Sequence, residues 1–176
     1  MKKVIVIGGG AAGLIAAIYA ARSGANVTVL EKMKRVGKKL LITGKGRCNI
    51  TNTASKQEYI KNMIGNGSFL YSAFSQYSNE DVVDFFHQLD VPTKVERGGR
   101  VFPVSDKAAD VVNALVHEAN RLGVEIITDQ AVSKIQSTDG KITGVKSISG
   151  GIYPADAVIL ATGGASYPGT GSTGDG

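Results

Sequence analysis

The chain has 176 residues, 43% of them hydrophobic, and is therefore long enough to bury the core of one domain or slightly more. Its single cysteine excludes an intramolecular disulfide and a CxxC metal site, and it favours a reducing, cytoplasmic compartment. The net charge of +5 is concentrated between Lys32 and Arg47, where seven cations occur without an acid, and this favours a bound phosphate group over a general polyanion-binding surface.

The N-terminal residues predict a complete βαβ unit. Lys3–Ile7 is a continuous apolar run, typical of a strand buried on both faces of a parallel sheet. Ala11–Arg22 predicts a helix that ends at Ser23–Gly24, and Asn26–Glu31 predicts the second strand. The uncharged run Val4–Ala21 has the length of a membrane or signal segment, but three successive glycines interrupt it, and we reject that interpretation.

The middle of the chain predicts an irregular segment followed by regular elements. Residues 32–78 are rich in Gly, Asn, Ser and Lys, with one short helix near 57–63, and so long a loop region is usually functional. A capping box at Ser78 predicts a helix through Leu89. The elements expected after it are a strand at 93–96, a turn at Gly98–Gly99, a strand at 100–104 and a helix from Ser105 through Leu122.

The last third predicts two core strands joined by an antiparallel meander. Val124–Thr128 and Ala157–Ala161 read as buried strands, and three short strands between them cover 131–136, 142–148 and 152–154. A glycine-rich loop follows from Ser166, where a doubly wound sheet would continue into another helix and strand. We therefore expect the chain to be the N-terminal part of a longer protein.

The glycine motif indicates a dinucleotide site. Gly8, Gly10 and Gly13 follow a predicted strand and open a predicted helix, and Glu31 ends the next strand 18 residues beyond Gly13. The helix N-terminus suits a pyrophosphate, and Glu31 suits a ribose and disfavours a 2′-phosphate. The motif alone does not decide whether the dinucleotide is NAD or FAD, because both kinds of site share it. The meander between the third and fourth strands, in place of a crossover helix, resembles the FAD-binding domains of the two-dinucleotide flavoproteins.

Three further stretches make the resemblance specific: Gly44–Asn52, Arg100–Ala108 and Ala161–Asp175. Together they resemble the bacterial BaiN-like, or NAD(FAD)-utilising dehydrogenase, flavoproteins, and the match covers the whole chain. The resemblance implies an α/β fold, a Rossmann-like FAD-binding domain over residues 1–176 with a parallel central sheet and an antiparallel meander crossover. It also implies that a second domain is inserted after this N-terminal portion.

The motif and the resemblance together predict a set of cofactor-binding residues. Arg47 or Arg100 is a candidate cation for the reduced flavin, and Arg100 with Phe102–Pro103 either closes the flavin face or forms a structural turn. Cys48 would lie near the flavin ring, as an inert buried thiol or a redox participant. Tyr167 and Asp175 are further candidate neighbours. The predicted cofactor-binding residues are Gly8, Gly10, Ala11, Ala12, Gly13, Glu31, Lys32, Gly37, Lys38, Lys39, Gly46, Arg47, Cys48, Asn49, Val132, Ala161, Thr162, Gly163 and Gly164.

The function expected from this resemblance is that of a cytoplasmic FAD-dependent oxidoreductase. NAD(P)H would reduce the flavin, which would then reduce a small organic acceptor. We expect no metal, no nucleic acid and no membrane as partner, and the sequence assigns no catalytic acid or base and no oligomeric state. Two alternatives stay open: a flavoprotein associated with tRNA, for which the basic segment argues, and a non-catalytic FAD-binding module.

Overall fold

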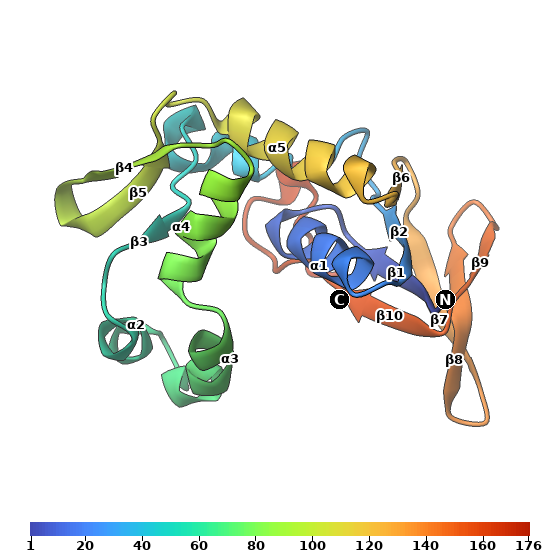
Figure 1. The fold of residues 1–176 in the computed structure, drawn as a ribbon. Helices are drawn as coiled ribbons and strands as arrows, with labels where there is room; N and C mark the ends of the chain where they lie inside the picture. Colours follow the sequence, from blue (N-terminus) through green and yellow to red (C-terminus); the bar gives the residue numbers. More distant parts are fainter. The chain divides into compact units, whose positions relative to one another are not determined.

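The computed structural model describes every residue from Met1 to Gly176 (Figure 1). The chain forms two compact units. Unit 1 comprises Met1–Leu41 and Leu115–Gly176, and unit 2 comprises Ile42–Ala114. No helix combines the length and hydrophobicity that crossing a membrane requires.

A parallel sheet forms the centre of unit 1 and confirms the prediction of an α/β fold. Its strand order is β10-β1-β2-β6, and every neighbouring pair is parallel. Ile7 of β1 lies in register with Leu30 of β2 and Leu160 of β10, so the segments that follow these strands emerge at one edge of the sheet. Ligands of open α/β sheets bind at that edge. The strands are β1 (Lys3–Ile7), β2 (Asn26–Leu30), β6 (Glu125–Ile127) and β10 (Ala157–Leu160).

Helix α1 (Ala11–Arg22) connects β1 to β2 and packs on this sheet (Figure 1). Its buried residues include Leu14, Ala17 and Ile18, all fully shielded from solvent, and small residues let the helix approach the strands closely. The helix ends as predicted: Gly24 has φ +85°, and its amide donates to the carbonyl of Ala21.

The predicted meander lies between β6 and β10. Its three strands form an antiparallel sheet in the order β7-β8-β9. Asp139 and Gly140 both have positive φ in the turn between the first two strands, as an Asp-Gly hairpin turn requires. Val145 and Ala155 from this part of the chain pack against the core of the parallel sheet. The strands are β7 (Val132–Thr138), β8 (Lys141–Ser147) and β9 (Ile152–Pro154).

Unit 2 combines a small antiparallel sheet with short helices. The sheet order is β3-β5-β4. Ser78 caps the third helix of the unit through the predicted capping box with Asp81. The segment expected to be mostly irregular contains more structure than the sequence indicates. The elements are η1 (Leu40–Gly46, which spans the boundary of the units), β3 (Thr51–Asn52), α2 (Lys56–Asn62), η2 (Gly67–Leu70), α3 (Tyr71–Gln76), α4 (Asn79–Gln88), β4 (Thr93–Glu96), η3 (Arg97–Gly99) and β5 (Arg100–Pro103).

Three predictions of local structure are wrong. The strand expected to be buried at Val124–Thr128 is β6, which lies at one edge of the sheet and has an exposed Glu125. The helix expected to start at Ser105 is α5 (Ala108–Arg121), because Asp106 takes a left-handed conformation with φ +55° and its carboxylate binds cations elsewhere in unit 2. The strand expected to be buried at the C-terminal end is β10, and its Leu160 is 54% exposed. β10 is an edge strand that pairs only with β1, so one of its sides has no strand to cover it.

Candidate functional site

The glycine-rich turn after β1 is built by two close backbone approaches. Gly8 has φ +105°, and a Cβ atom there would lie 2.5 Å from the carbonyl oxygen of Ala161. A Cβ atom at Gly13 would overlap the carbonyl oxygen of Gly8. At Gly10, in contrast, no atom lies within 4 Å of where a Cβ would be. Gly8 and Gly13 are therefore required by the fold, whereas Gly10 borders open space in front of the helix.

The N-terminus of α1 faces this open space without a side-chain cap. Gly10 is the N-cap residue, in an extended conformation, and no side chain bonds to the free amides of the first turn. Ala11 and Ala12 are exposed. Unpaired amides at a helix N-terminus carry partial positive charge and bind phosphate oxygens. The three residues thus leave an uncapped helix N-terminus open to solvent, and their binding to a pyrophosphate stays a prediction.

Glu31 is fixed beside the turn. Its Oε2 accepts a hydrogen bond from the amide of Gly9 at 2.7 Å, and its Oε1 accepts one from the amide of Met33 at 2.8 Å. An ionised carboxylate has about four acceptor positions, so capacity remains for ribose hydroxyls. Gly9 was not among the predicted site residues. The run of three glycines is the sequence signal that could have identified it, since a Cβ there would overlap Val36.

The segment after β2 returns to the turn and contacts the C-terminal loop of unit 1. The amide of Gly37 donates to the carbonyl of Gly9 at 2.8 Å. Lys39 Nζ donates to Ser166 Oγ at 3.0 Å, and Lys32 Nζ pairs with Asp175. Hydrogen bonding by Lys32 lowers the pKa of Asp175. Two of the predicted phosphate-binding lysines therefore have partners within the protein, while Lys38 is half-buried.

Two other predicted groups of unit 1 have different surroundings. Ala161 and the three residues after it, Thr162, Gly163 and Gly164, follow β10 at the edge of the sheet where ligands bind, and the amide of Ala161 donates to the carbonyl of Ile7. Val132 begins β7, and its side chain packs on the hydrophobic core. Val132 also pairs with Ser147 of β8, and its contact to the cofactor stays a prediction.

Gly46, Arg47, Cys48 and Asn49 lie in unit 2, in a loop with an unusual backbone. Gly44, Lys45, Gly46 and Cys48 all have positive φ. For Lys45 and Cys48, which carry side chains, this conformation costs on the order of 1 kcal/mol each. The amide of Cys48 donates to the carbonyl of Thr43 at 3.0 Å, and a Cβ at Gly44 would lie 2.8 Å from the Phe102 ring. The surrounding contacts hold the loop in this shape.

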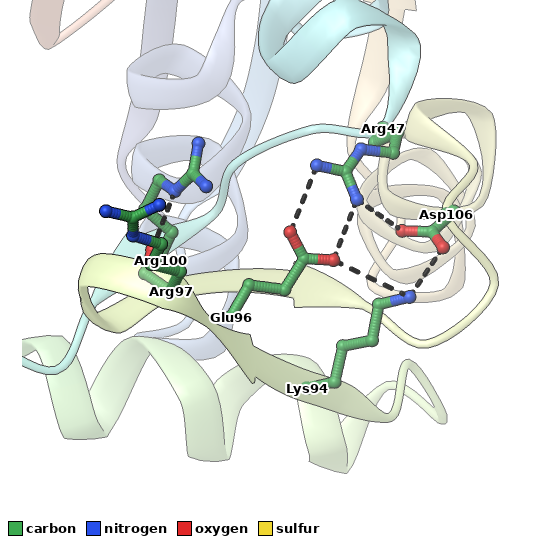
Figure 2. Close-up of polar contacts among 6 residues, drawn as sticks. All are labelled: Arg47, Lys94, Glu96, Arg97, Arg100 and Asp106. Carbon is green, nitrogen blue, oxygen red and sulfur yellow. Dashed lines mark hydrogen bonds and ion pairs between the residues drawn. The ribbon is translucent and has the colours of Figure 1, made fainter.

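Arg47 provides the strongest of these contacts (Figure 2). Its guanidinium stacks on the ring of Phe102, 4.1 Å from the ring centroid. Nη1 and Nη2 donate to the two carboxylate oxygens of Glu96 at 2.8 and 3.1 Å, and Nη1 also donates to Asp106 at 3.2 Å. Lys94 pairs with both carboxylates from the other side. We call Arg47, Glu96, Asp106 and Lys94 the four-residue ion cluster.

The ion cluster changes the interpretation of Arg47. Hydrogen bonding by Arg47 lowers the pKa of Glu96, and hydrogen bonding by Lys94 lowers that of Asp106, so both acids are ionised at neutral pH. The charge of Arg47 is therefore compensated within unit 2. Lys94, Glu96 and Asp106 were not predicted as site residues. The sequence carries no signal for them, because Arg47, which joins Glu96 and Asp106 into one cluster, lies 49 and 59 residues away from them along the chain.

Cys48 has the properties of an inert thiol. It is 1% exposed, and burial raises its pKa, which keeps the thiol protonated at neutral pH. Asn49 beside it is exposed. The structure thus favours the first of the two roles considered for this cysteine.

Removal of the Arg47 guanidinium is expected to loosen the loop around Cys48. Cys48 is the only cysteine, so its reaction rate with a thiol-specific disulfide reagent reports how often the loop opens. We expect Arg47→Ala to accelerate this reaction at least tenfold. Lys61→Ala, which removes an exposed cation of α2, should leave the rate unchanged. Equal rates in wild type and Arg47→Ala would contradict the holding role of the ion cluster.

Comparison with known proteins gives the family and the fold. The family model described as the HI0933-like protein Rossmann domain matches residues 2–176. A 3-dehydro-bile acid delta(4,6)-reductase of Clostridium scindens is 39% identical over all of this chain and 42% of its own length. A ribosomal RNA dihydrouridine synthase of Haemophilus influenzae is 32% identical over 96% of this chain and 42% of its own length. The chain thus spans less than half the length of these relatives.

The solved structures agree on the fold. A 3-ketosteroid-delta4-(5alpha)-dehydrogenase of Rhodococcus jostii superposes with a TM-score of 0.69 at 22% identity, over 92% of this chain and 46% of its own. The predicted fold class, a Rossmann-like FAD-binding fold with a parallel central sheet, is confirmed.

Proposed function

Because the chain belongs to the HI0933-like family, we propose that it is the FAD-binding part of an oxidoreductase that uses NAD(P)H to reduce an organic acceptor. The observation that carries the proposal is the cradle at the start of α1. There the N-terminus has no side-chain cap, Gly10 borders open space, and Glu31 is held beside the turn by Gly9. Few arrangements other than a dinucleotide site require all three features.

FAD fits the residues of unit 1. The amides at the start of α1 would neutralise its pyrophosphate, and the free acceptor positions of Glu31 would bind the adenosine ribose. Lys39 and Lys38 add positive charge after β2. When bound, FAD supplies the chemistry, which is the transfer of two electrons from NAD(P)H to the acceptor. The contributions of Gly46, Arg47, Cys48 and Asn49 to the same cofactor stay a prediction.

The names of two relatives narrow the proposed acceptor. One is a delta(4,6)-reductase of a 3-dehydro compound, and the other makes dihydrouridine. Both names describe the addition of hydrogen to a carbon–carbon double bond that is conjugated with a carbonyl group. Such a bond accepts a hydride at the carbon remote from the carbonyl, and the charge that develops on oxygen must be stabilised. We infer that the acceptor here is an α,β-unsaturated carbonyl compound.

The absorbance spectrum of the purified protein tests this function. We expect a yellow protein that bleaches on anaerobic addition of NADH or NADPH and regains its colour with 2-cyclohexenone. Saturated cyclohexanone, which lacks the double bond, should restore no colour and serves as the control. A colourless protein that cannot be reconstituted with FAD would contradict the proposal.

A second candidate function is action on RNA. It is favoured by the relative that acts on ribosomal RNA and by Lys34, Arg35 and Lys45, which are exposed cations of the basic segment. Against it, two other cations of the segment, Lys32 and Arg47, pair with acids of the chain. Binding of tRNA or ribosomal RNA to the FAD-saturated protein that weakens with salt would favour this candidate.

A further inference from the structure

Unit 2 holds two arginines whose charge is not compensated by an acid. In the four-residue ion cluster the two cations balance the two carboxylates. Arg97 and Arg100 flank the turn between β4 and β5, and neither forms an ion pair, although Glu96 is the next residue in the chain to Arg97. Figure 2 shows both guanidinium groups at the turn end of the hairpin, apart from the cluster. The excess positive charge of this region therefore resides on the two arginines.

The side chain of Arg100 is oriented before any ligand arrives. Its Nε donates to the carbonyl oxygen of Arg97 at 3.1 Å, and its guanidinium carbon lies 5.7 Å from the centroid of the Phe102 ring. These contacts use one face and one donor of the guanidinium. The two Nη groups remain as a free fork, which is the geometry that binds a carboxylate or phosphate through two parallel hydrogen bonds.

The turn that carries both arginines is itself held firmly. Asn52 Nδ2 donates to the carbonyl of Gly98 at 2.7 Å, and the amide of Thr53 donates to that of Gly99 at 2.8 Å. Gly99 has φ +72°, and a Cβ there would lie 2.6 Å from Thr53 Oγ1. The turn thus adopts a conformation that only glycine accommodates easily, and it fixes the backbone that carries Arg97 and Arg100.

We propose that Arg97 and Arg100 bind the carboxylate of a small-molecule substrate. The proposal rests on the proposed function and adds a selection for anionic acceptors. A nucleic-acid phosphate offers similar oxygens, but proteins that bind single-stranded RNA usually combine cations with exposed aromatic rings on which bases stack. The aromatic ring next to the pair belongs to Phe102, which is 1% exposed beneath Arg47. The pair therefore fits a single oxyanion better than a polynucleotide.

Calorimetric titration of the FAD-saturated protein with cholate, below its micellar concentration, tests the proposal. Cholate is a bile acid with one carboxylate, and the Clostridium scindens relative is named for a bile acid. We expect the double variant Arg97→Gln/Arg100→Gln to raise the Kd for cholate at least tenfold. The control Lys61→Gln/Lys107→Gln removes two exposed positive charges from the same unit and should change the Kd less than twofold. Cholate methyl ester, which lacks the negative charge, should bind wild type and the arginine double variant equally. Arg100→Lys keeps the charge but loses the two-pronged guanidinium, and its Kd for cholate should lie between those of wild type and the arginine double variant.

Three results would overturn the assignment. The first is a wild type that binds no cholate, and the second is equal Kd values for cholate in the two double variants. The third is an arginine double variant that binds cholate like wild type but binds a 12-nucleotide RNA more weakly. The visible spectrum of the same samples tests the proposed function separately. A yellow protein with unchanged cholate binding contradicts only the arginine pair, whereas a protein that takes up no FAD contradicts the oxidoreductase itself.

Discussion

Gly13→Ala is expected to destabilise unit 1 by about 3 kcal/mol, because the new methyl group would overlap the carbonyl oxygen of Gly8. The neighbouring atoms are backbone, so relief requires α1 to move away from β1. For a chain of this size the loss corresponds to a decrease in Tm of roughly 6–12 °C. Thermal unfolding followed by circular dichroism measures it.

Gly10→Ala is the matched control for this substitution. No atom lies within 4 Å of the added methyl group, and an alanine at an N-cap costs less than about 1 kcal/mol relative to glycine. We expect this variant to fold with nearly the wild-type Tm but to bind FAD at least tenfold more weakly, since the methyl group enters the phosphate cradle. A Gly10→Ala protein with unchanged FAD affinity would show that the pyrophosphate lies elsewhere.

Glu118→Gln is expected to produce the second large effect, and a pH-dependent one. Glu118 on α5 is 3% exposed and accepts hydrogen bonds from Arg121 at 2.6 Å and from Arg22 of α1 at 2.7 Å. Hydrogen bonding by Arg121, assisted by Arg22, lowers the pKa of Glu118 from 4.5 to about 2. Both arginine side chains are partly exposed to solvent, which weakens the ion pairs. We therefore expect the ionised carboxylate to contribute on the order of 2 kcal/mol to the free energy of unfolding.

The direction of the pH dependence follows from the lowered pKa. Because the folded-state pKa lies below the unfolded-state value, the contribution is fully present above pH 4.5 and is lost as the pH falls toward about 2. The free energy of unfolding of wild type should therefore decrease over this range more steeply than that of Glu118→Gln. Denaturant titrations at several pH values measure both slopes. Glu125→Gln, at an exposed carboxylate of the same unit, should retain the wild-type slope, and parallel curves for all three proteins would contradict the role of Glu118.

The parts of the fold that the sequence predicts well depend on near neighbours in the chain. The apolar run of β1, the glycine turn and α1 follow one another within twenty residues, and the secondary structure of each is predicted from its own residues. The turn at Asp139–Gly140 likewise determines its own hairpin. Glu31 could be assigned beside the turn because the parallel register of β1 and β2 follows from the connecting helix.

The charges of the site illustrate what could not be predicted. Seven cations between Lys32 and Arg47 suggest a phosphate site, but Arg47 finds Glu96 and Asp106 only after β4 and β5 pair. Lys32 and Asp175 are 143 residues apart. Charge runs in a sequence report how many cations are present, whereas the tertiary structure decides which of them are neutralised.

Two of the local errors have the same origin. Ser105 has the chemistry of a helix cap, yet Asp106 takes a left-handed conformation while its carboxylate binds Lys94 and Arg47, and α5 begins later. The apolar residues of β10 are typical of a central strand, but their burial depends on the order of the sheet, in which β10 is at the edge. In both cases contacts between distant segments outweigh a local preference.

By itself, the sequence determined the βαβ start, its glycine turn and the meander, because hydrophobic periodicity and glycine spacing act over a few residues. Only the tertiary structure decided that Arg47 holds a loop while Arg97 and Arg100 remain uncompensated, and that Glu118 joins α1 to α5. Such assignments depend on which charges meet in space. The energy of a Coulomb attraction depends on the distance between the two charges in the folded protein, and this distance does not follow from their separation along the chain.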